Sequence, residues 1–290
     1  MADFLTSTHR SKWIFVPQDL KEKYKAANHR AKQMLEKYGA TRVDVDLDGS
    51  LAYPELQSDA KDNAEKHSRS KPLKIDEEQL LRAFYEFKIQ DVCDAFKFPR
   101  KIQASTILIQ QVSMNRLTCI YTACKAEENH VSAEELGKGI DQDHHVILNN
   151  EMISLGFDLI VYSPYRSIDG FINDMEDLHE TAKMVADKTM RTEAPLLFSP
   201  GQLALAALRR SNEEHQVVDF ERYLDSILSR QHPAHPVSEL TVFLNAIDQL
   251  VNKLVTPTAA DMKHIDRKLK YCRDPGSHEK YKKRKHRSKD

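Results

Sequence analysis

Two segments of the chain share a helical pattern that is stable only inside a bundle. Residues 115–129 read NRLTCIYTACKAEEN and residues 201–214 read GQLALAALRRSNEE, and they align with Leu117 against Leu203, 86 positions apart. Small and apolar side chains surround most of each helix instead of forming one stripe, so each helix needs several others packed closely around it. The pattern therefore predicts two central helices, each in the middle of its own helical bundle.

The segments around these two helices carry the single apolar stripes of helices that cover a bundle. One stripe runs through residues 81–96 and another through residues 238–253, with apolar side chains three or four positions apart. Ser132 and Glu135 have the spacing of a capping box that opens a short helix, and residues 142–155 predict a further helix. With only 8 glycines in 290 residues, the chain favours helix over strand and turn. We predict an all-α fold of two tandem five-helix bundles.

The ends of the chain and one internal stretch differ from the bundles. Apolar residues recur at helical spacing from Leu20 to Tyr38, whereas residues 57–72 hold no apolar side chain except two alanines. The first pattern predicts an amphipathic helix of about 20 residues, and the second predicts a solvated linker. We therefore divide the chain into an N-terminal helix (1–38), a polar linker (39–74), a first bundle (75–160), a second bundle (161–255), a C-terminal helix (256–273) and a basic disordered tail (274–290).

The stretch DVDLDGSLAYPE, residues 44–55, fits the template of an EF-hand calcium loop. Aspartates stand at loop positions one, three and five, Gly49 at six and Glu55 at twelve. A working hand also needs an apolar-faced helix on each side and usually a second hand. Here Pro54 precedes the final glutamate, only Leu56 is apolar in the segment that follows, and no second loop exists. We interpret the stretch as an aspartate-rich turn and not as a calcium site.

The motifs of the common enzyme classes are absent from the sequence. It has no GxSxG, no phosphate-binding glycine loop and no HExxH, and its four cysteines form no CxxC pair. Glu127 and Glu128 are neighbours on a helix and point about 100° apart, so they make a poor acid–base pair, and a solvated face is the default interpretation. The same divergence keeps His144 and His145 from sharing a metal ion. We expect no catalytic residue, no metal site and no cofactor.

The charge is distributed unevenly. Residues 280–289, KYKKRKHRSK, hold seven Lys and Arg, whereas the chain without residues 280–290 holds 36 Lys and Arg against 43 Asp and Glu. An acidic body does not suit a duplex-binding surface, and the tail is typical of a nuclear-import signal, with loose nucleic-acid contact or a solubilising role as alternatives. No apolar run approaches the ~18 residues of a membrane span, and the first residues lack the apolar core of a secretory signal.

Five stretches of the sequence resemble the cyclin H family, most closely its plant members. They are STHRSKWIF (7–15), KIQAS (101–105), ACKAEENHVSAEELGKGI (123–140), FDLIVYSPYRSIDGF (157–171) and EAPLLFSPGQLALAAL (193–208). The similarity extends from about residue 7 to residue 272 without the linker. It implies two tandem cyclin boxes. The first box is shortened, because residues 105–117 run almost directly from one helix into the next.

The resemblance implies a regulatory role without chemistry of its own. A cyclin H would bind and activate a cyclin-dependent kinase, together with a RING-finger assembly factor and the TFIIH core, in the nucleus. The residues that match the kinase-binding positions of the family are Lys125 and Glu151, with Glu128 bordering the same surface. Two alternatives remain, a DNA-binding transcription factor of the TFIIB type, which also uses paired cyclin folds, and a shortened cyclin H isoform without function.

Overall fold

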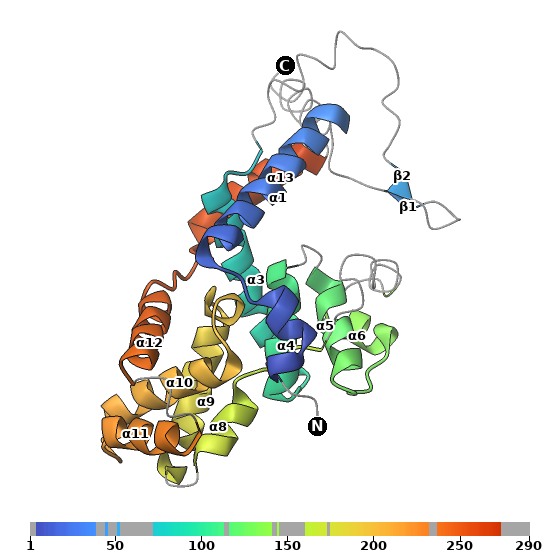
Figure 1. Ribbon diagram of the computed structural model, residues 1–290. Helices are drawn as coiled ribbons and strands as arrows, with labels where there is room; N and C mark the ends of the chain where they lie inside the picture. The colour runs from blue at the N-terminus through green and yellow to red at the C-terminus, as the bar shows by residue number, and fades with distance from the viewer. Residues whose placement is uncertain are drawn as a thin grey trace, which may run out of the picture. The chain divides into compact units, whose positions relative to one another are not determined.

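The computed structural model describes residues 4–38, 44–45, 51–52, 72–112, 116–140, 144, 160–172, 175–231 and 237–273. Within these ranges helix dominates, apart from a two-residue antiparallel pairing of β1 (Asp44–Val45) with β2 (Leu51–Ala52) (Figure 1). The prediction of an all-α fold is confirmed. Contacts divide the chain into two compact units. The first contains Met1–Val16 and Tyr85–Val255, and the second contains Pro17–Phe84 and Thr256–Asp290.

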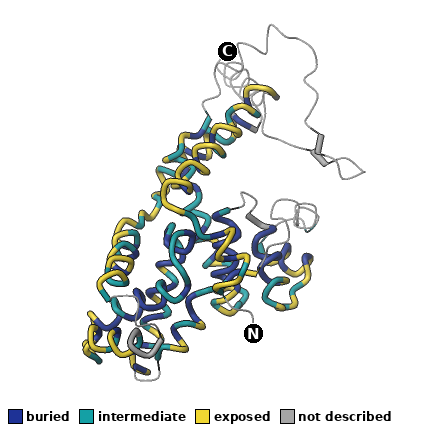
Figure 2. The backbone as a smooth tube through the Cα atoms, in the orientation of Figure 1, coloured by how far each residue is buried: buried dark blue, intermediate teal, exposed yellow. Residues whose placement is uncertain are grey.

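The first bundle lies in the first unit and is centred on α5 (Arg116–Ala126). It also contains α4 (Arg100–Val112), α6 (Ala133–Gly139) and the second half of α3 (Ile75–Ala95). Every residue from 102 to 111 of α4 is buried, and so is every residue from 118 to 124 of α5 (Figure 2). The predicted central helix is therefore confirmed. The shortened connection after α4 does not expose the small residues of α5, because α4 packs along it.

The second bundle is arranged around α10 (Pro200–His215), which packs against α8 (Tyr165–Phe171), α9 (His179–Met190) and α12 (Val237–Asn252). The bundle also contains η4 (Glu176–Leu178), η5 (Ala194–Leu196) and α11 (Phe220–Gln231). Ser199 and Gln202 form a capping box that satisfies backbone donors at the start of α10, and Pro200 occupies its first turn. All six residues from 203 to 208 are buried, which confirms the second central helix.

A carboxylate joins the two bundles. Asp187 of α9 accepts a hydrogen bond from Tyr165 Oη at 2.6 Å and pairs with Arg100 Nε of α4 at 3.3 Å. Burial raises the pKa of Asp187, and the hydrogen bond and the nearby guanidinium only partly offset that effect. Tyr165 and Arg100 both favour the ionised form of this carboxylate, although they do not fully compensate for its burial.

A buried amide makes a second connection between the bundles. Gln111, at the end of α4, lies with its Nε2 3.0 Å from Glu86 Oε1, 3.2 Å from the Met190 carbonyl oxygen and 3.0 Å from the Thr192 carbonyl oxygen. Glu86 belongs to α3, and the two carbonyls belong to the end of α9 and the turn after it. The two amide hydrogens thus serve three acceptors from two other segments, which fixes α3, α4 and α9 at one point.

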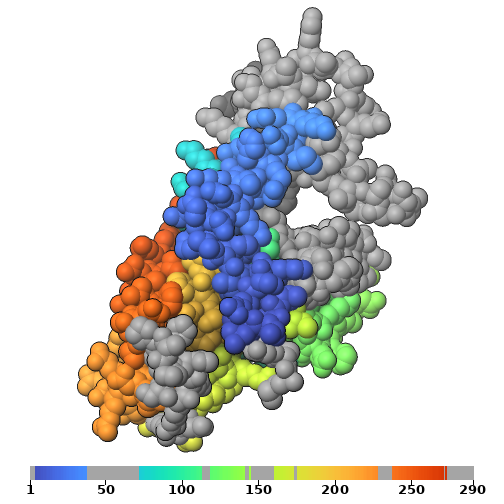
Figure 3. Space-filling view, viewed as in Figure 1, coloured from blue at the N-terminus to red at the C-terminus, as the bar shows by residue number. Residues whose placement is uncertain are grey.

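The N-terminal segment, the darkest blue in Figure 3, is part of the first unit and packs there through aromatic rings. It forms η1 (Phe4–Thr6) and the π-helical turn η2 (His9–Trp13). His9 is buried, its ring is stacked on Tyr162 at a centroid distance of 6.1 Å, and its Nδ1 accepts a hydrogen bond from the Tyr162 backbone N–H at 2.9 Å. The stretch assigned to the N-terminal helix (1–38) therefore begins with this segment, and the long helix α1 itself begins at Pro17, a residue favoured at a first helical position.

The stability of the protein should fall as His9 becomes protonated. Burial lowers the pKa of His9 to about 4, against about 6.5 in an unfolded chain. Between these two pH values the unfolded state binds more protons than the folded state. The stability that the neutral His9 ring contributes is therefore fully present above pH 6.5 and is lost as the pH falls toward 4. We expect the free energy of unfolding to drop by about 2 kcal/mol between pH 7 and pH 5 because of this group. Urea unfolding at a series of pH values measures the drop.

The control for this prediction is His9→Asn, which keeps an acceptor near the position of Nδ1 and cannot titrate. Its stability should change less than that of the wild type over the same pH range, and the difference between the two curves isolates His9. Parallel curves for both proteins would contradict the assignment.

The second unit brings helices from both ends of the chain together. It contains α1 (Pro17–Tyr38), α13 (Ala259–Arg273) and the first half of α3. Asn28 Nδ2 donates to the Leu73 carbonyl oxygen at 2.9 Å, and Lys268 Nζ donates to the two oxygens of Glu77 at 2.6 and 2.7 Å. Burial opposes the charge on Glu77, but the hydrogen bonds from Lys268, the Lys74 backbone and His264 outweigh it and hold the pKa of Glu77 below its usual value. Leu20, Tyr24, Leu35, Leu73, Leu81, Met262, Ile265 and Cys272 are buried in this unit.

Several sequence-based expectations fall outside the described residues. They are most of the polar linker 39–74, the basic tail 274–290 and almost all of the helix predicted for residues 142–155. Of the EF-hand-like stretch 44–55, the structure describes only the residues of β1 and β2. The domain boundaries stay a prediction. In the part of the chain that the structure describes, no helix is both long and apolar enough to cross a bilayer.

Candidate functional site

The C-terminal end of α5 carries two of the residues predicted to bind a partner. Glu128 adopts a left-handed backbone conformation with φ 55° just after the helix. Its N–H donates to the Lys125 carbonyl oxygen at 3.2 Å, and the Asn129 N–H donates to the Cys124 carbonyl oxygen at 2.8 Å. This pair of bonds is the Schellman motif, which satisfies the last carbonyls of a helix. The motif leaves the Lys125 and Glu128 side chains exposed at the same turn.

Lys125 is oriented by an aromatic ring beneath it. Its Nζ lies 4.5 Å from the centroid of the Tyr121 ring, one helical turn earlier, and Tyr121 itself is buried. Such a cation–π contact contributes about 0.5–1 kcal/mol at an exposed site. The charge is therefore held above a rigid, buried helix, which lowers the entropy lost when a partner binds it.

Glu127 connects this turn to α4, and sequence reasoning missed it. Ser105 Oγ donates to Glu127 Oε1 at 2.6 Å, and Lys101 Nζ donates to the Glu127 carbonyl oxygen at 2.9 Å and lies 3.4 Å from Oε2. The default interpretation of a solvated face is therefore wrong for Glu127, whose side chain is 21% exposed. Lys101 and Ser105 are four residues apart and lie on one face of α4, but nothing in that spacing identifies Glu127 as their partner.

The arrangement suits recognition and not chemistry. The ammonium group of Lys125 and the carboxylate of Glu128 are exposed to solvent at the end of a buried helix. Beside them, the carboxylate of Glu127 is already paired with Lys101 and Ser105. Among the described residues no group of three His, Cys, Asp or Glu could hold a metal ion. Glu151, the third predicted residue, lies outside the described residues, so its proximity to Lys125 stays a prediction.

Replacing Glu128 by glycine should separate its backbone role from its side-chain role. A non-glycine residue with a left-handed backbone conformation is about 1 kcal/mol less stable than glycine in the same conformation. We therefore expect Glu128→Gly to raise the free energy of unfolding by about 0.5–1 kcal/mol. If the carboxylate also contacts the partner, the same variant binds that partner less tightly. Thermal unfolding and binding titration of one protein sample give both quantities.

Lys97 provides the matched control, because it follows α3 with the same φ of 55°. Its N–H donates to the Asp94 carbonyl oxygen, and the next N–H donates to the Cys93 carbonyl oxygen, as in the motif at Glu128. Lys97→Gly should raise stability to a similar extent and leave partner affinity unchanged. A loss of affinity in both variants would show that Glu128 has no specific contact.

Comparisons with known sequences find relatives along nearly the whole chain. The cyclin C-terminal domain family matches residues 163–252. Cyclin-H1-1 of Arabidopsis thaliana is 53% identical, and the alignment covers 98% of this chain and 93% of that protein. The alignment runs over 314 positions, more than the 290 residues of this chain, so the relative has segments that this chain lacks.

Two solved structures of similar fold come from the CAK and TFIIK complexes. One chain of the CAK complex of Chaetomium thermophilum bound to ATP-γ-S superposes with a TM-score of 0.70 at 20% identity, covering 94% of this chain and 89% of that one. A chain of the yeast TFIIK complex (Kin28/Ccl1/Tfb3) superposes with a TM-score of 0.56 at 18% identity, covering 86% of this chain and 100% of that one. At these identities the two likenesses establish the fold.

Proposed function

The chain belongs to the cyclin H family, and we propose on this premise that it is the regulatory subunit that binds and activates a cyclin-dependent kinase of the CDK-activating type. The observation that carries the proposal is the 53% identity to Cyclin-H1-1 over 98% of the chain. As a member of the cyclin H family, the protein is a regulatory subunit and not itself an enzyme. Phosphorylation of CDK activation loops and of the RNA polymerase II C-terminal domain is the expected output of the complex.

Activation of this kind depends on differential binding. A rigid surface that binds the active arrangement of the kinase more tightly than the inactive one shifts the population toward the active form. In a kinase the required change is inward movement of the αC helix, so that its glutamate pairs with the lysine that orients the ATP phosphates. The end of α5 supports this role, because Lys125 and Glu128 project from a buried helix held to α4 through Glu127.

Three finer assignments accompany the proposal. We place the protein in a complex with a RING-finger assembly factor and with the TFIIH core, in the nucleus. The support is that the yeast chain of similar fold comes from a complex named TFIIK with three named components. The basic stretch at residues 280–289 is consistent with nuclear import.

Co-expression with a CDK-activating kinase from the same organism, followed by gel filtration, tests the proposal. We expect a stable one-to-one complex whose activity toward a CDK activation-loop substrate exceeds that of the kinase alone. Two separate peaks with unchanged kinase activity would refute it. They would favour the alternative of a shortened family member without function.

The DNA-binding alternative makes a different prediction. A transcription factor of the TFIIB type uses basic helices on its cyclin folds, and log affinity then falls linearly with log salt concentration. The acidic body of this chain argues against such a surface. Electrophoretic mobility shifts of the chain with duplex DNA at physiological salt should show no complex.

A further inference from the structure

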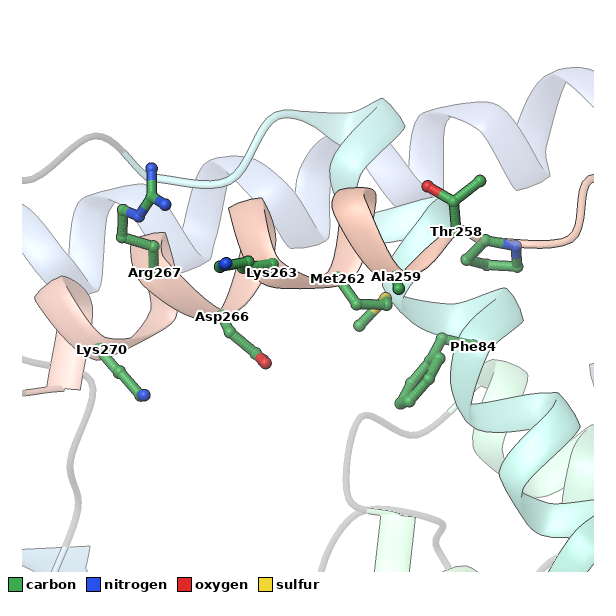
Figure 4. A pocket seen from close by; sticks show the side chains of 9 residues that line it. Phe84, Thr258, Ala259, Met262, Lys263, Asp266, Arg267 and Lys270 are labelled. Atoms are coloured by element: carbon green, nitrogen blue, oxygen red, sulfur yellow. The ribbon is translucent and has the colours of Figure 1, made fainter.

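The second unit contains a groove whose lining includes none of the predicted kinase-binding residues. It has a volume of about 620 Å³ and lies along α13, next to Phe84 of α3 (Figure 4). Its apolar lining comes from Phe84, Pro257, Ala259 and Met262. Met262 is buried and Phe84 is half-buried, so the floor is anchored in the core of the unit and can accept an apolar side chain.

The polar lining of the groove is predominantly positive. Three basic residues of α13 line the groove: Lys263, and Arg267 and Lys270, which follow it by four and seven residues. The only acid among the lining residues is Asp266. All four side chains belong to exposed residues. In Figure 4 Lys270 and Asp266 project to the same open side as Phe84 and Met262, whereas Arg267 extends from the opposite edge of the helix. Lys263, next to Met262, is therefore the cation closest to the apolar floor, and Lys270 lies farther along α13 on the same open side.

Within the described part of the chain, no acid forms an ion pair with the cations of the groove. Lys263, Arg267 and Lys270 form no ion pair with any residue that the structure describes, whereas Lys268 on the same helix is paired with Glu77. Asp261, the other acid of α13, accepts hydrogen bonds from Thr258 at the start of the helix. Positive charge next to an apolar floor suits an occupant that is both acidic and apolar.

We propose that this groove is a docking site for an acidic peptide segment of another protein, with an apolar side chain flanked by Asp or Glu. The apolar side chain would pack on Phe84 and Met262, and the flanking carboxylates would pair with Lys263 and Lys270. Charge complementarity selects the sign of the partner, and the apolar floor selects a peptide over a purely polar polyanion.

Fluorescence anisotropy with the full-length chain tests the proposal. The probe is the fluorescein-labelled peptide EDFLEELFDE, compared with oligoglutamate and with an oligothymidylate of matching length. We expect the probe to bind more tightly than either comparison ligand, and Lys263→Glu with Lys270→Glu to weaken it by about tenfold or more. Phe84→Ala should also weaken the probe without changing the charge of the groove.

The matched control reverses two exposed lysines of α1 in the same unit, Lys21→Glu with Lys25→Glu, which changes the net charge equally. This control should bind the probe as the wild type does. The proposal is wrong if both double variants lose affinity equally, since that result indicates non-specific attraction. It is also wrong if oligoglutamate or oligothymidylate binds as tightly as the probe, or if the probe does not bind.

Discussion

Lys125→Ala is expected to weaken the complex with the kinase by about 30-fold or more. Removing one partner of a desolvated charge contact costs about 2–5 kcal/mol, and about 1.4 kcal/mol corresponds to a tenfold change in affinity. The free chain should lose little stability, because the side chain is exposed and its contact with the Tyr121 ring contributes about 0.5–1 kcal/mol. Isothermal titration with the purified kinase gives the affinity, and urea unfolding gives the stability.

Two variants separate a specific contact from a general effect of charge. Lys125→Met keeps the apolar stem above Tyr121 and removes only the ammonium group, so it should lose nearly as much affinity as the alanine variant. Lys188, in the last turn of α9, is also an exposed lysine at a helix end, and Lys188→Ala should change affinity less than about twofold. Equal losses at Lys125 and Lys188 would remove the site assignment.

Glu151→Ala belongs to the same test, because the resemblance pairs it with Lys125. If the two residues contact one region of the kinase, the double variant should lose less affinity than the sum of the two single variants. Unchanged affinity in the double variant would show that neither residue is part of the interface.

Gln111→Leu is expected to lower the free energy of unfolding by about 3 kcal/mol. The substitution preserves the approximate volume but removes the donor that serves Glu86 and two backbone carbonyls. A buried carboxylate that loses a hydrogen bond costs more than a neutral group, and Glu86 is only 3% exposed. Urea denaturation followed by circular dichroism measures the change, since it yields the free energy of unfolding by linear extrapolation.

The preceding residue provides a close control. Gln110 is buried on the same helix, and its Oε1 has no hydrogen-bond partner among the described residues. Gln110→Leu should therefore be nearly neutral or stabilising, because it removes an unsatisfied polar atom without breaking a hydrogen bond. A similar loss in both variants would mean that packing, and not the junction at Glu86, determines the effect at Gln111.

Periodicity in the sequence was sufficient to predict the two central helices. Around Ala123 and Ala206 small residues face all directions, and only a helix enclosed by others is stable with that composition. The stripe in residues 81–96 likewise lies in α3 (Ile75–Ala95), apart from the residue just after its end. Whether a segment forms such a helix depends on residues three or four positions apart in the chain, so the spacing of apolar residues is enough to predict it.

Long-range partners could not be predicted in the same way. The stripe of α1 indicates that it must pack on another surface, but nothing in its spacing identifies α3 or α13 as that surface. Glu127 was interpreted as solvated because its partners, Lys101 and Ser105, belong to another helix. Lys125 and Glu128 were found by resemblance, and the Schellman geometry that positions them depends on a positive φ at a non-glycine residue, which the sequence does not signal.

The pairing of the two ends has a consequence for synthesis on the ribosome. Figures 1 and 4 show α1 beside α13, although the translated chain reaches Ala259 more than 200 residues after Tyr38. At about 5–20 residues per second, the nascent α1 would wait roughly 10–45 seconds for α13 to emerge. During that interval its apolar stripe is only partly covered, so a chaperone that recognises exposed apolar helices would have its best opportunity to engage this protein before translation ends.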